Sequence, residues 1–176
     1  REMTAARTRF LDGGWYSPLR QALCDLALTH AGPSYTILDA GCGEGYYTEN
    51  LFSVFHNAGR SFQLAGVDLS KSALKKVAGA SVDLLVDCFA PLALDEYRRV
   101  LRPGGTFLYV VPGPRHLIEL KRVLYDRPYE NLEQDIPYDG FTPLGVTPVN
   151  CHFTLDRKSA LDLFRMTPYA WKTPRE

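Results

Sequence analysis

The stretch YTILDAGCGEGYYTEN, residues 35–50, decides the fold of this chain. Its residues 36–38 form a short apolar run of the kind that ends a buried strand, and Asp39 closes the run. Three glycines follow within five positions, namely Gly41, Gly43 and Gly45. Glycines allow positive φ angles and let a ligand approach the backbone closely. From residue 46 the apolar spacing predicts a helix, so the stretch reads as the first half of a nucleotide-binding βαβ unit.

The charges beside the glycines favour a cationic ligand. A dinucleotide loop offers a helix N-terminus to an anionic pyrophosphate. Here Asp39 and Glu44 flank the turn, and two carboxylates would repel a pyrophosphate. They suit the ammonium and sulfonium groups of S-adenosylmethionine instead. The pattern Asp-x-Gly-x-Gly-x-Gly resembles the cofactor loop of class I methyltransferases; a phosphate loop and a tight turn without a ligand are the alternatives.

The composition is that of an ordinary globular domain. The chain has 176 residues, 45% of them hydrophobic, and 20 basic residues balance 20 acidic ones. The balanced charge by itself does not indicate a nucleic-acid partner. Four cysteines lie far apart in the sequence, which argues against a metal site or a disulfide framework. No apolar run is long enough for a membrane span, and reduced thiols favour the cytoplasm.

A second predicted strand, residues 62–67, ends at Asp68. An acid a little over twenty residues beyond the glycines is placed to accept hydrogen bonds from both ribose hydroxyls. Leu69 follows and is expected to lie along the adenosine. A helix is predicted over residues 71–78. Only residues 77–81 separate this helix from the next strand, and they are too few for a third strand and its crossover. The acid or amide that would contact the adenine is therefore not identified.

The next strand, residues 82–86, leads to candidate substrate residues. Class I enzymes that methylate nitrogen hold the target at the end of this strand. Phe89 could stack there on a flat base, with Pro91 beside it, or Phe89 could fill the core. A helix over 92–101 and a strand over 106–111 follow. Arg115 and His116 then start a predicted helix at a strand's carboxyl end, where they either bind the cofactor carboxylate or only cap the helix. Arg115 is also a candidate substrate-binding residue.

The last part of the chain has weaker signals. Residues 125–149 are rich in Pro, Tyr, Asp and Gly, and they are either a flap over the substrate or a surface excursion. Residues 149–155 predict a sixth strand and 157–165 a helix, with no room for a seventh strand. The predicted fold is α/β: a doubly wound, mostly parallel sheet with helices on both faces. Residues 1–34 are expected to form an N-terminal helical segment beside the cofactor pocket, and residues 35–176 are expected to form the cofactor-binding domain. In the N-terminal segment, Tyr16 either contacts the ligand or packs against other side chains.

Six stretches together resemble the bacterial 23S ribosomal RNA (guanine-N1)-methyltransferases, over nearly the whole chain. The glycine loop is shared by many methyltransferases, whereas PGPRHLIELK (112–121) and MTPYAW (166–171) are narrower. The other matching stretches are residues 6–20, 66–71 and 89–91. The resemblance implies that Tyr16, Gly43, Glu44 and His116 touch S-adenosylmethionine.

The resemblance also implies a substrate and partners. The expected activity is methyl transfer to N1 of a guanine in a hairpin of 23S ribosomal RNA. The expected location is the cytoplasm, without membrane association, and a homodimer is an alternative to a monomer. Family members carry an N-terminal zinc module that helps to grip RNA. Because nothing before Arg1 supplies it, zinc is expected only in such a module and no metal in this chain. No residue is an obvious base for the N1 proton; Asp87 and His116 are the best placed. The alternatives are a small-molecule methyltransferase and a non-catalytic domain that binds S-adenosylmethionine.

Overall fold

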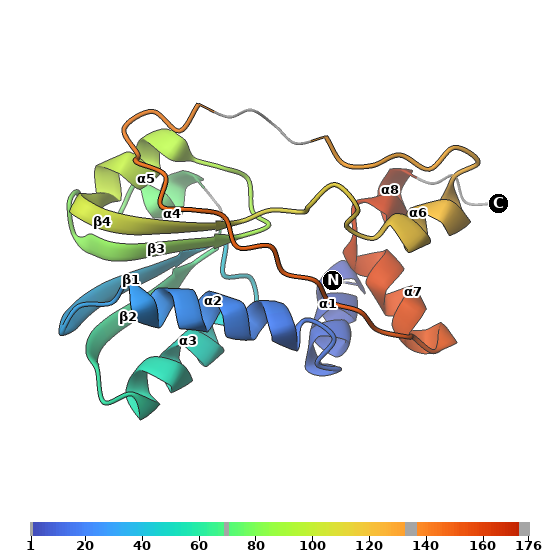
Figure 1. Ribbon diagram of the computed structural model, residues 1–176, viewed down its shortest axis with the longest axis horizontal. Helices are drawn as coiled ribbons and strands as arrows, with labels where there is room; N and C mark the ends of the chain where they lie inside the picture. The colour runs from blue at the N-terminus through green and yellow to red at the C-terminus, as the bar shows by residue number, and fades with distance from the viewer. Residues whose placement is uncertain (1, 69–70, 133–136, 173–176) are drawn as a thin grey trace. The chain divides into compact units, whose positions relative to one another are not determined.

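Four parallel strands form the sheet in the computed structural model, which describes residues 2–68, 71–132 and 137–172 (Figure 1). The strands are β1 (Ser34–Ala40), β2 (Ser61–Val67), β3 (Val82–Cys88) and β4 (Leu101–Val110), in the spatial order β2-β1-β3-β4. The chain therefore winds outward from β1 to β2, then returns past β1 to β3 and β4. This doubly wound order places a topological switch point between β1 and β3. The predicted α/β class with a parallel sheet is confirmed.

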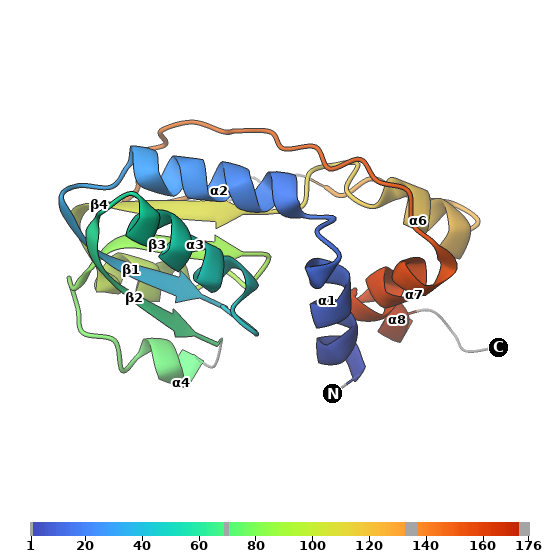
Figure 2. The same ribbon diagram turned by 90° about the horizontal axis from the view of Figure 1, so that it is seen from below.

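Helices cover both faces of the sheet (Figures 1 and 2). On one face lie α2 (Ser17–Thr29) and α3 (Tyr46–Asn57), joined by a hydrogen bond from Asn50 Nδ2 to Cys24 Sγ of 2.9 Å. On the other lie α4 (Lys71–Leu74) and α5 (Leu94–Val100). Their apolar side chains meet those of the strands in a buried cluster that comprises Leu38, Ala40, Leu74, Val82, Leu85, Tyr97, Val100 and Leu101. This arrangement follows from right-handed crossovers in a sheet that winds in two directions.

The helix predicted over 71–78 is shorter than expected. It ends at Leu74, and the backbone N–H groups of Lys76 and Val77 donate to the carbonyls three residues earlier, those of Ala73 and Leu74. Arg99 of α5 donates from Nη2 to the carbonyl of Leu74 and from Nη1 to that of Val77, both at 2.9 Å. These bonds satisfy carbonyls that a longer helix would have used. Residues 68–81 thus connect β2 directly to β3, and the described residues of this connection contain no additional strand.

The predicted strand over 149–155 is wrong. Residues 149–156 show no strand, although their exposure alternates along the chain as it would in one. Phe153 packs its ring against Phe10, Trp15 and Tyr16, with centroids 5.8–6.3 Å apart. In this stretch Phe153 thus packs onto α1 and the turn that follows it, and the backbone has no ladder partner.

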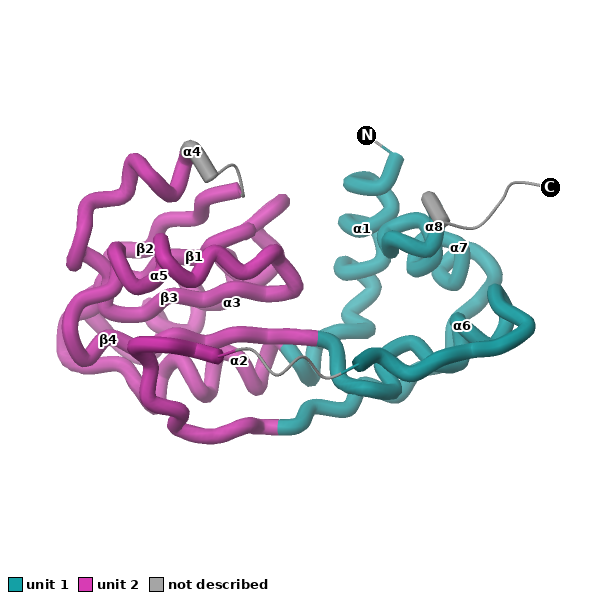
Figure 3. The backbone as a smooth tube through the Cα atoms, turned by 90° about the horizontal axis from the view of Figure 1, so that it is seen from above, with its two compact units in different colours: residues 1–19, 112–135, 148–176 teal, residues 20–111, 136–147 magenta. Residues whose placement is uncertain are grey.

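The chain divides into two compact units (Figure 3). Unit 2 holds the sheet and comprises residues 20–111 and 136–147, and unit 1 comprises residues 1–19, 112–135 and 148–176. Unit 1 contains α1 (Glu2–Asp12), α6 (Ile118–Leu124), α7 (Arg157–Met166) and α8 (Tyr169–Lys172). These units do not coincide with the predicted boundary after residue 34, because unit 1 gathers segments from three parts of the chain.

Two buried charges organise unit 1. Asp162 of α7 accepts hydrogen bonds from Arg9 Nε at 3.0 Å and Nη2 at 2.6 Å, which is a bidentate pair that joins α1 to α7. Lys121 of α6 is fully buried, and its ammonium donates to the Tyr129 carbonyl at 3.0 Å and to Asn131 Oδ1 at 2.7 Å. The Tyr129 ring centroid lies 4.3 Å from the same nitrogen. Lys121 thereby fixes the segment that follows α6.

Candidate functional site

The glycine loop sits where β1 ends, held by the end of β2. The backbone N–H groups of Gly41 and Cys42 both donate to the Val67 carbonyl, at 2.7 and 3.2 Å. Gly45 has φ +88° and precedes α3, and a Cβ added there would meet nothing within 4 Å. The loop is thus anchored on its sheet side and has open space at Gly45. Such a cradle of backbone accepts a ligand without interference from side chains.

Asp39 lies beneath this loop and is 1% exposed. Its Oδ2 accepts a hydrogen bond of 2.5 Å from the Thr48 hydroxyl in the first turn of α3. Glu44 is exposed near the tip of the loop. Asp39, near the end of β1, thus lies next to the loop that holds the three glycines and Glu44. Two carboxylates and open backbone form a donor set that fits a cationic ligand and disfavours a phosphate.

Asp68 stands next to this loop because β2 and β1 run in register. Ala40 pairs with Val67, so Asp68 follows directly at the edge where Gly41 begins the loop. The Asp68 side chain is exposed. Leu69, the predicted adenosine contact, lies outside the described residues.

Gly66 permits tight packing between β2 and the loop. A Cβ built at Gly66 would lie 2.8 Å from the Cys42 sulfur and 2.9 Å from the Cys42 Cβ, both of which are closer than real contacts. The absence of a side chain at Gly66 therefore lets Cys42 lie against β2. The same packing couples the glycine loop to the strand that directly precedes Asp68.

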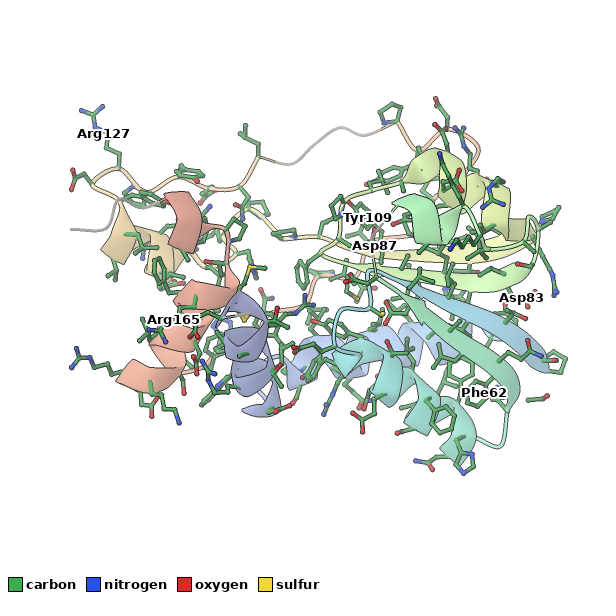
Figure 4. All side chains as sticks on the ribbon, turned by 180° about the vertical axis from the view of Figure 1, so that it is seen from behind. Phe62, Asp83, Asp87, Tyr109, Arg127 and Arg165 are labelled. Atoms are coloured by element: carbon green, nitrogen blue, oxygen red, sulfur yellow. The ribbon has the colours of Figure 1, made fainter. Side chains whose placement is uncertain are left out.

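Asp87 lies at the carboxyl end of β3, across the switch point from β1 (Figure 4). It is fully buried; its Oδ2 accepts from the Tyr97 hydroxyl at 2.7 Å and its Oδ1 from the Ala90 N–H at 2.9 Å. Burial raises the pKa of Asp87 to about 6, and the negative charge of Asp39 acts in the same direction. Tyr109 of β4 pairs with Asp87 in the ladder. The predicted base is thus an internal carboxylate with engaged oxygens.

The predicted substrate residues follow Asp87 in the chain. Phe89 is 36% exposed and has φ +61°, and its N–H donates to the Val110 carbonyl at 3.0 Å. Pro91 is exposed. Phe89 thus does not fill the core, and it lies at the sheet edge where α/β folds bind ligands.

Unit 1 brings two other predicted residues together, 100 positions apart in the sequence. The Tyr16 and His116 rings pack edge to face with centroids 6.3 Å apart. Tyr16 is 6% exposed, and burial raises its pKa. Burial lowers the pKa of His116, and the positive charge of Lys121 lowers it further. His116 is therefore a neutral imidazole at neutral pH, with a ring nitrogen able to accept a proton.

The helix predicted to start at Arg115 and His116 begins later, at Ile118. His116 belongs to the preceding turn, in which its N–H donates to the Gly113 carbonyl at 3.0 Å. Leu117 adopts φ +56° and ends the turn. The physical reason is that this left-handed residue interrupts helical geometry between the turn and α6. Arg115 is exposed.

Comparisons with known proteins place the chain in a family. No family profile matches it. The Bacillus subtilis (strain 168) protein YxjB, which carries the provisional name 23S rRNA (guanine-N(1)-)-methyltransferase, is 31% identical over 99% of this chain and 71% of its own length. The Streptomyces fradiae 23S rRNA (guanine(748)-N(1))-methyltransferase is 29% identical over 97% of this chain and 69% of its own. The chain belongs to the 23S rRNA (guanine-N1)-methyltransferase family.

The family assignment makes the chain a methyltransferase and supports S-adenosylmethionine as the methyl donor. The alignment with YxjB spans 203 residues, whereas this chain has 176, so it contains positions that this chain lacks. A crystal structure of a Methanococcus maripaludis protein, provisionally described as an S-adenosyl-L-methionine-dependent methyltransferase, is 17% identical over 69% of this chain and 68% of that one, with a TM-score of 0.47. At that similarity it carries no weight in the assignment.

Four residues at or beside the predicted site residues escape sequence reasoning. Thr48 donates a hydrogen bond to Asp39, and Tyr97 donates one to Asp87. Gly66 leaves room for the Cys42 side chain, and the positive charge of Lys121 lowers the pKa of His116. Thr48 had a signal, since a hydroxyl in the first helical turn can reach the strand that precedes the loop. Tyr97 and Lys121 had none, because a residue on an amphipathic helix does not reveal its buried partner.

Two observations on the described residues complete the site. They contain no cluster of three His, Cys, Asp or Glu side chains placed to bind a metal ion. None of the helices described is both long and apolar enough to cross a membrane.

Proposed function

We propose that this protein transfers a methyl group from S-adenosylmethionine to N1 of a guanine in a hairpin of 23S ribosomal RNA. The observation that carries the proposal is the carboxylate-flanked glycine loop at the switch point of the sheet, in a chain of this family. The guanine and the RNA come from the names of its relatives. Activity is expected in the cytoplasm, where ribosomal RNA is modified.

The cofactor would lie along the carboxyl edge of β1 and β2. Asp39 and Glu44 would offset the positive charge of the methionine end, and Asp68 would accept hydrogen bonds from the ribose hydroxyls. The glycines would let the cofactor approach the backbone. Tyr16 and His116 stay proposed contacts on the strength of the family resemblance, and Leu69 on its place after Asp68.

When bound, S-adenosylmethionine supplies an activated methyl group, which moves from sulfur to N1 as the sulfur–carbon bond breaks, the nitrogen–carbon bond forms and the N1 proton is released. The protein therefore has to align the guanine and accept or pass on one proton. His116 is the proposed acceptor, and Asp87 is the other residue that the sequence predicts as a base. His116 is neutral at neutral pH because burial and Lys121 lower its pKa. Asp87 is buried with both oxygens engaged, which favours His116.

The target guanine has to leave the base stack, because N1 is the Watson–Crick edge of a paired base. Phe89 is proposed to stack on it, a contact worth about 1–3 kcal/mol. Pro91 is proposed to flank Phe89, and Arg115 to bind a phosphate or base edge. Both are exposed.

A methyltransferase for a small molecule is the second candidate, favoured by the formal net charge of zero. Proteins that bind RNA through phosphates need an excess of basic residues, at least locally. Transfer of radiolabelled methyl to 23S rRNA fragments, run in parallel with a metabolite panel, separates the two. Label on RNA supports the proposal, whereas label on a metabolite and none on RNA refutes it. Calorimetry tests for S-adenosylmethionine binding in the same preparation, and binding without transfer would indicate a non-catalytic domain.

A further inference from the structure

The Asp87 carboxylate joins three parts of unit 2. Its Oδ2 accepts from the hydroxyl of Tyr97, a fully buried residue of α5. Its Oδ1 accepts from the N–H of Ala90, three residues further along the chain. The second bond closes the turn that contains Cys88 and Phe89. One side chain thus ties the end of β3 to the turn after it and to the helix behind it.

Phe89 sits inside this turn in a conformation that a bulky residue rarely adopts. Its φ of +61° falls in the left-handed region, where the Cβ crowds the backbone. Such a conformation persists only where the surroundings impose it, and such positions cluster at ligand sites. Here the Asp87–Ala90 bond holds one side of the turn, and the bond from the Phe89 N–H to the Val110 carbonyl holds the other.

We propose that Asp87 is a positioning residue that locks the turn over residues 88–90, so that the Phe89 ring is held at the sheet edge for stacking on the flat target base. This inference rests on the proposed function, in which a base is the substrate. It assigns Asp87 no proton transfer. It also makes Tyr97 a second positioning residue, because its hydroxyl holds the other oxygen of the same carboxylate.

Burial decides between a positioning role and that of a general base. A base has to come within hydrogen-bond reach of the proton it removes. Asp87 is 0% exposed, with one oxygen directed at the turn and the other at α5, whereas Phe89 is 36% exposed. The raised pKa of Asp87 fits either role, since burial is its largest cause. Phe89 is thus the member of this group that a substrate reaches.

Asparagine at position 87 separates the two roles. Asp87→Asn keeps an oxygen for the Ala90 N–H and places an amide near the Tyr97 hydroxyl, which can accept as well as donate. It removes the basicity. We expect D87N to retain methyl transfer to 23S rRNA within about threefold, and D87A to raise the KM for RNA by about tenfold or more. The Kd for S-adenosylmethionine should stay unchanged in both.

A double substitution tests whether Asp87 acts through Phe89. In a Phe89→Ala background, adding D87A should cost nothing more, because the ring that Asp87 positions is already gone. Phe52→Ala is the matched control: Phe52 is a 52% exposed phenylalanine on α3, and its loss should leave transfer unchanged. Additive losses from D87A and F89A would overturn the inference.

Amide hydrogen exchange at Ala90 reads the turn without any activity. The Ala90 N–H should be protected in the native protein and in D87N, and exposed to exchange in D87A. An unprotected Ala90 in the native protein, or protection that survives D87A, would overturn the inference. So would a D87N variant that keeps this protection but loses transfer by a factor of about a hundred, because Asp87 would then be the base. If the native protein methylates no RNA while the exchange results hold, the proposed function fails and the turn lock stands.

Discussion

Replacement of Gly66 by alanine tests how the glycine loop is held. The new Cβ would lie 2.8 Å from the Cys42 sulfur and 2.9 Å from the Cys42 Cβ. Rotation about the Cα–Cβ bond can move the sulfur, but the Cβ moves only with the backbone of Cys42, which is anchored to the Val67 carbonyl. Overpacking of this kind costs about 1–3 kcal/mol. If the fold absorbs the strain, the melting temperature falls by about 2–4 °C for each kcal/mol.

The alternative is that the loop moves and the strain appears in ligand binding. The same 1–3 kcal/mol would then weaken S-adenosylmethionine binding by roughly 5- to 150-fold. Differential scanning calorimetry and titration calorimetry on one preparation measure both effects. We expect the two losses together to account for the strain, whichever carries the larger share.

Two controls make this prediction sharp. Gly79→Ala adds the same methyl group where the Arg99 carbonyl is 3.5 Å away, an ordinary contact, and should change neither quantity. Cys42→Gly removes both crowding atoms, so the double variant G66A/C42G should recover what G66A loses, measured against C42G alone. Native stability together with native affinity in G66A would refute the packing argument.

Three further predictions address other parts of the molecule. Thr48→Val leaves the buried Asp39 carboxylate without its hydroxyl donor, so it should lower the free energy of unfolding, measured by urea titration, by about 1–3 kcal/mol. The control Thr29→Val, at an exposed hydroxyl on α2, should change this free energy by less than about 0.5 kcal/mol. The pKa of Asp87 is about 6 in the folded protein, against an ordinary value of 3.8, so its contribution to stability should be lost as pH rises from about 4 through 6. The loss of unfolding free energy is at most about 3 kcal/mol. D87N should flatten this fall, and an unchanged pH profile of stability in D87N would contradict the raised pKa. Lys121→Met should raise the pKa of His116 in an NMR titration because a nearby positive charge is removed, and a lower pKa would show that Lys121 acts otherwise.

Local sequence patterns predicted the sheet and its loop well, because the signals are short-range. The glycines after β1 and the acid after β2 each follow a strand directly, and parallel strands bring such residues to one edge. The place of Asp39, Glu44 and Asp68 therefore needed no knowledge of long-range packing.

Prediction failed where packing between distant segments overrides a local pattern. Residues 149–155 have the alternation of a strand, but Phe153 packs on rings from the first sixteen residues instead. Helix α4 ends at Leu74, whose carbonyl accepts a hydrogen bond from Arg99, 25 positions further along the chain. The partners of Asp87 were likewise hidden, because Tyr97 lies on the inner side of a helix and Ala90 acts through its backbone.

Primer extension on 23S ribosomal RNA tests the central claim most directly. A methyl group on N1 blocks the pairing edge of guanine and stops reverse transcription. Unmodified transcript incubated with this protein and S-adenosylmethionine should acquire one new stop, at a guanine in a hairpin, and none when the methyl donor is omitted. A protein that binds S-adenosylmethionine by calorimetry yet produces no stop on the full-length transcript would contradict the proposed function.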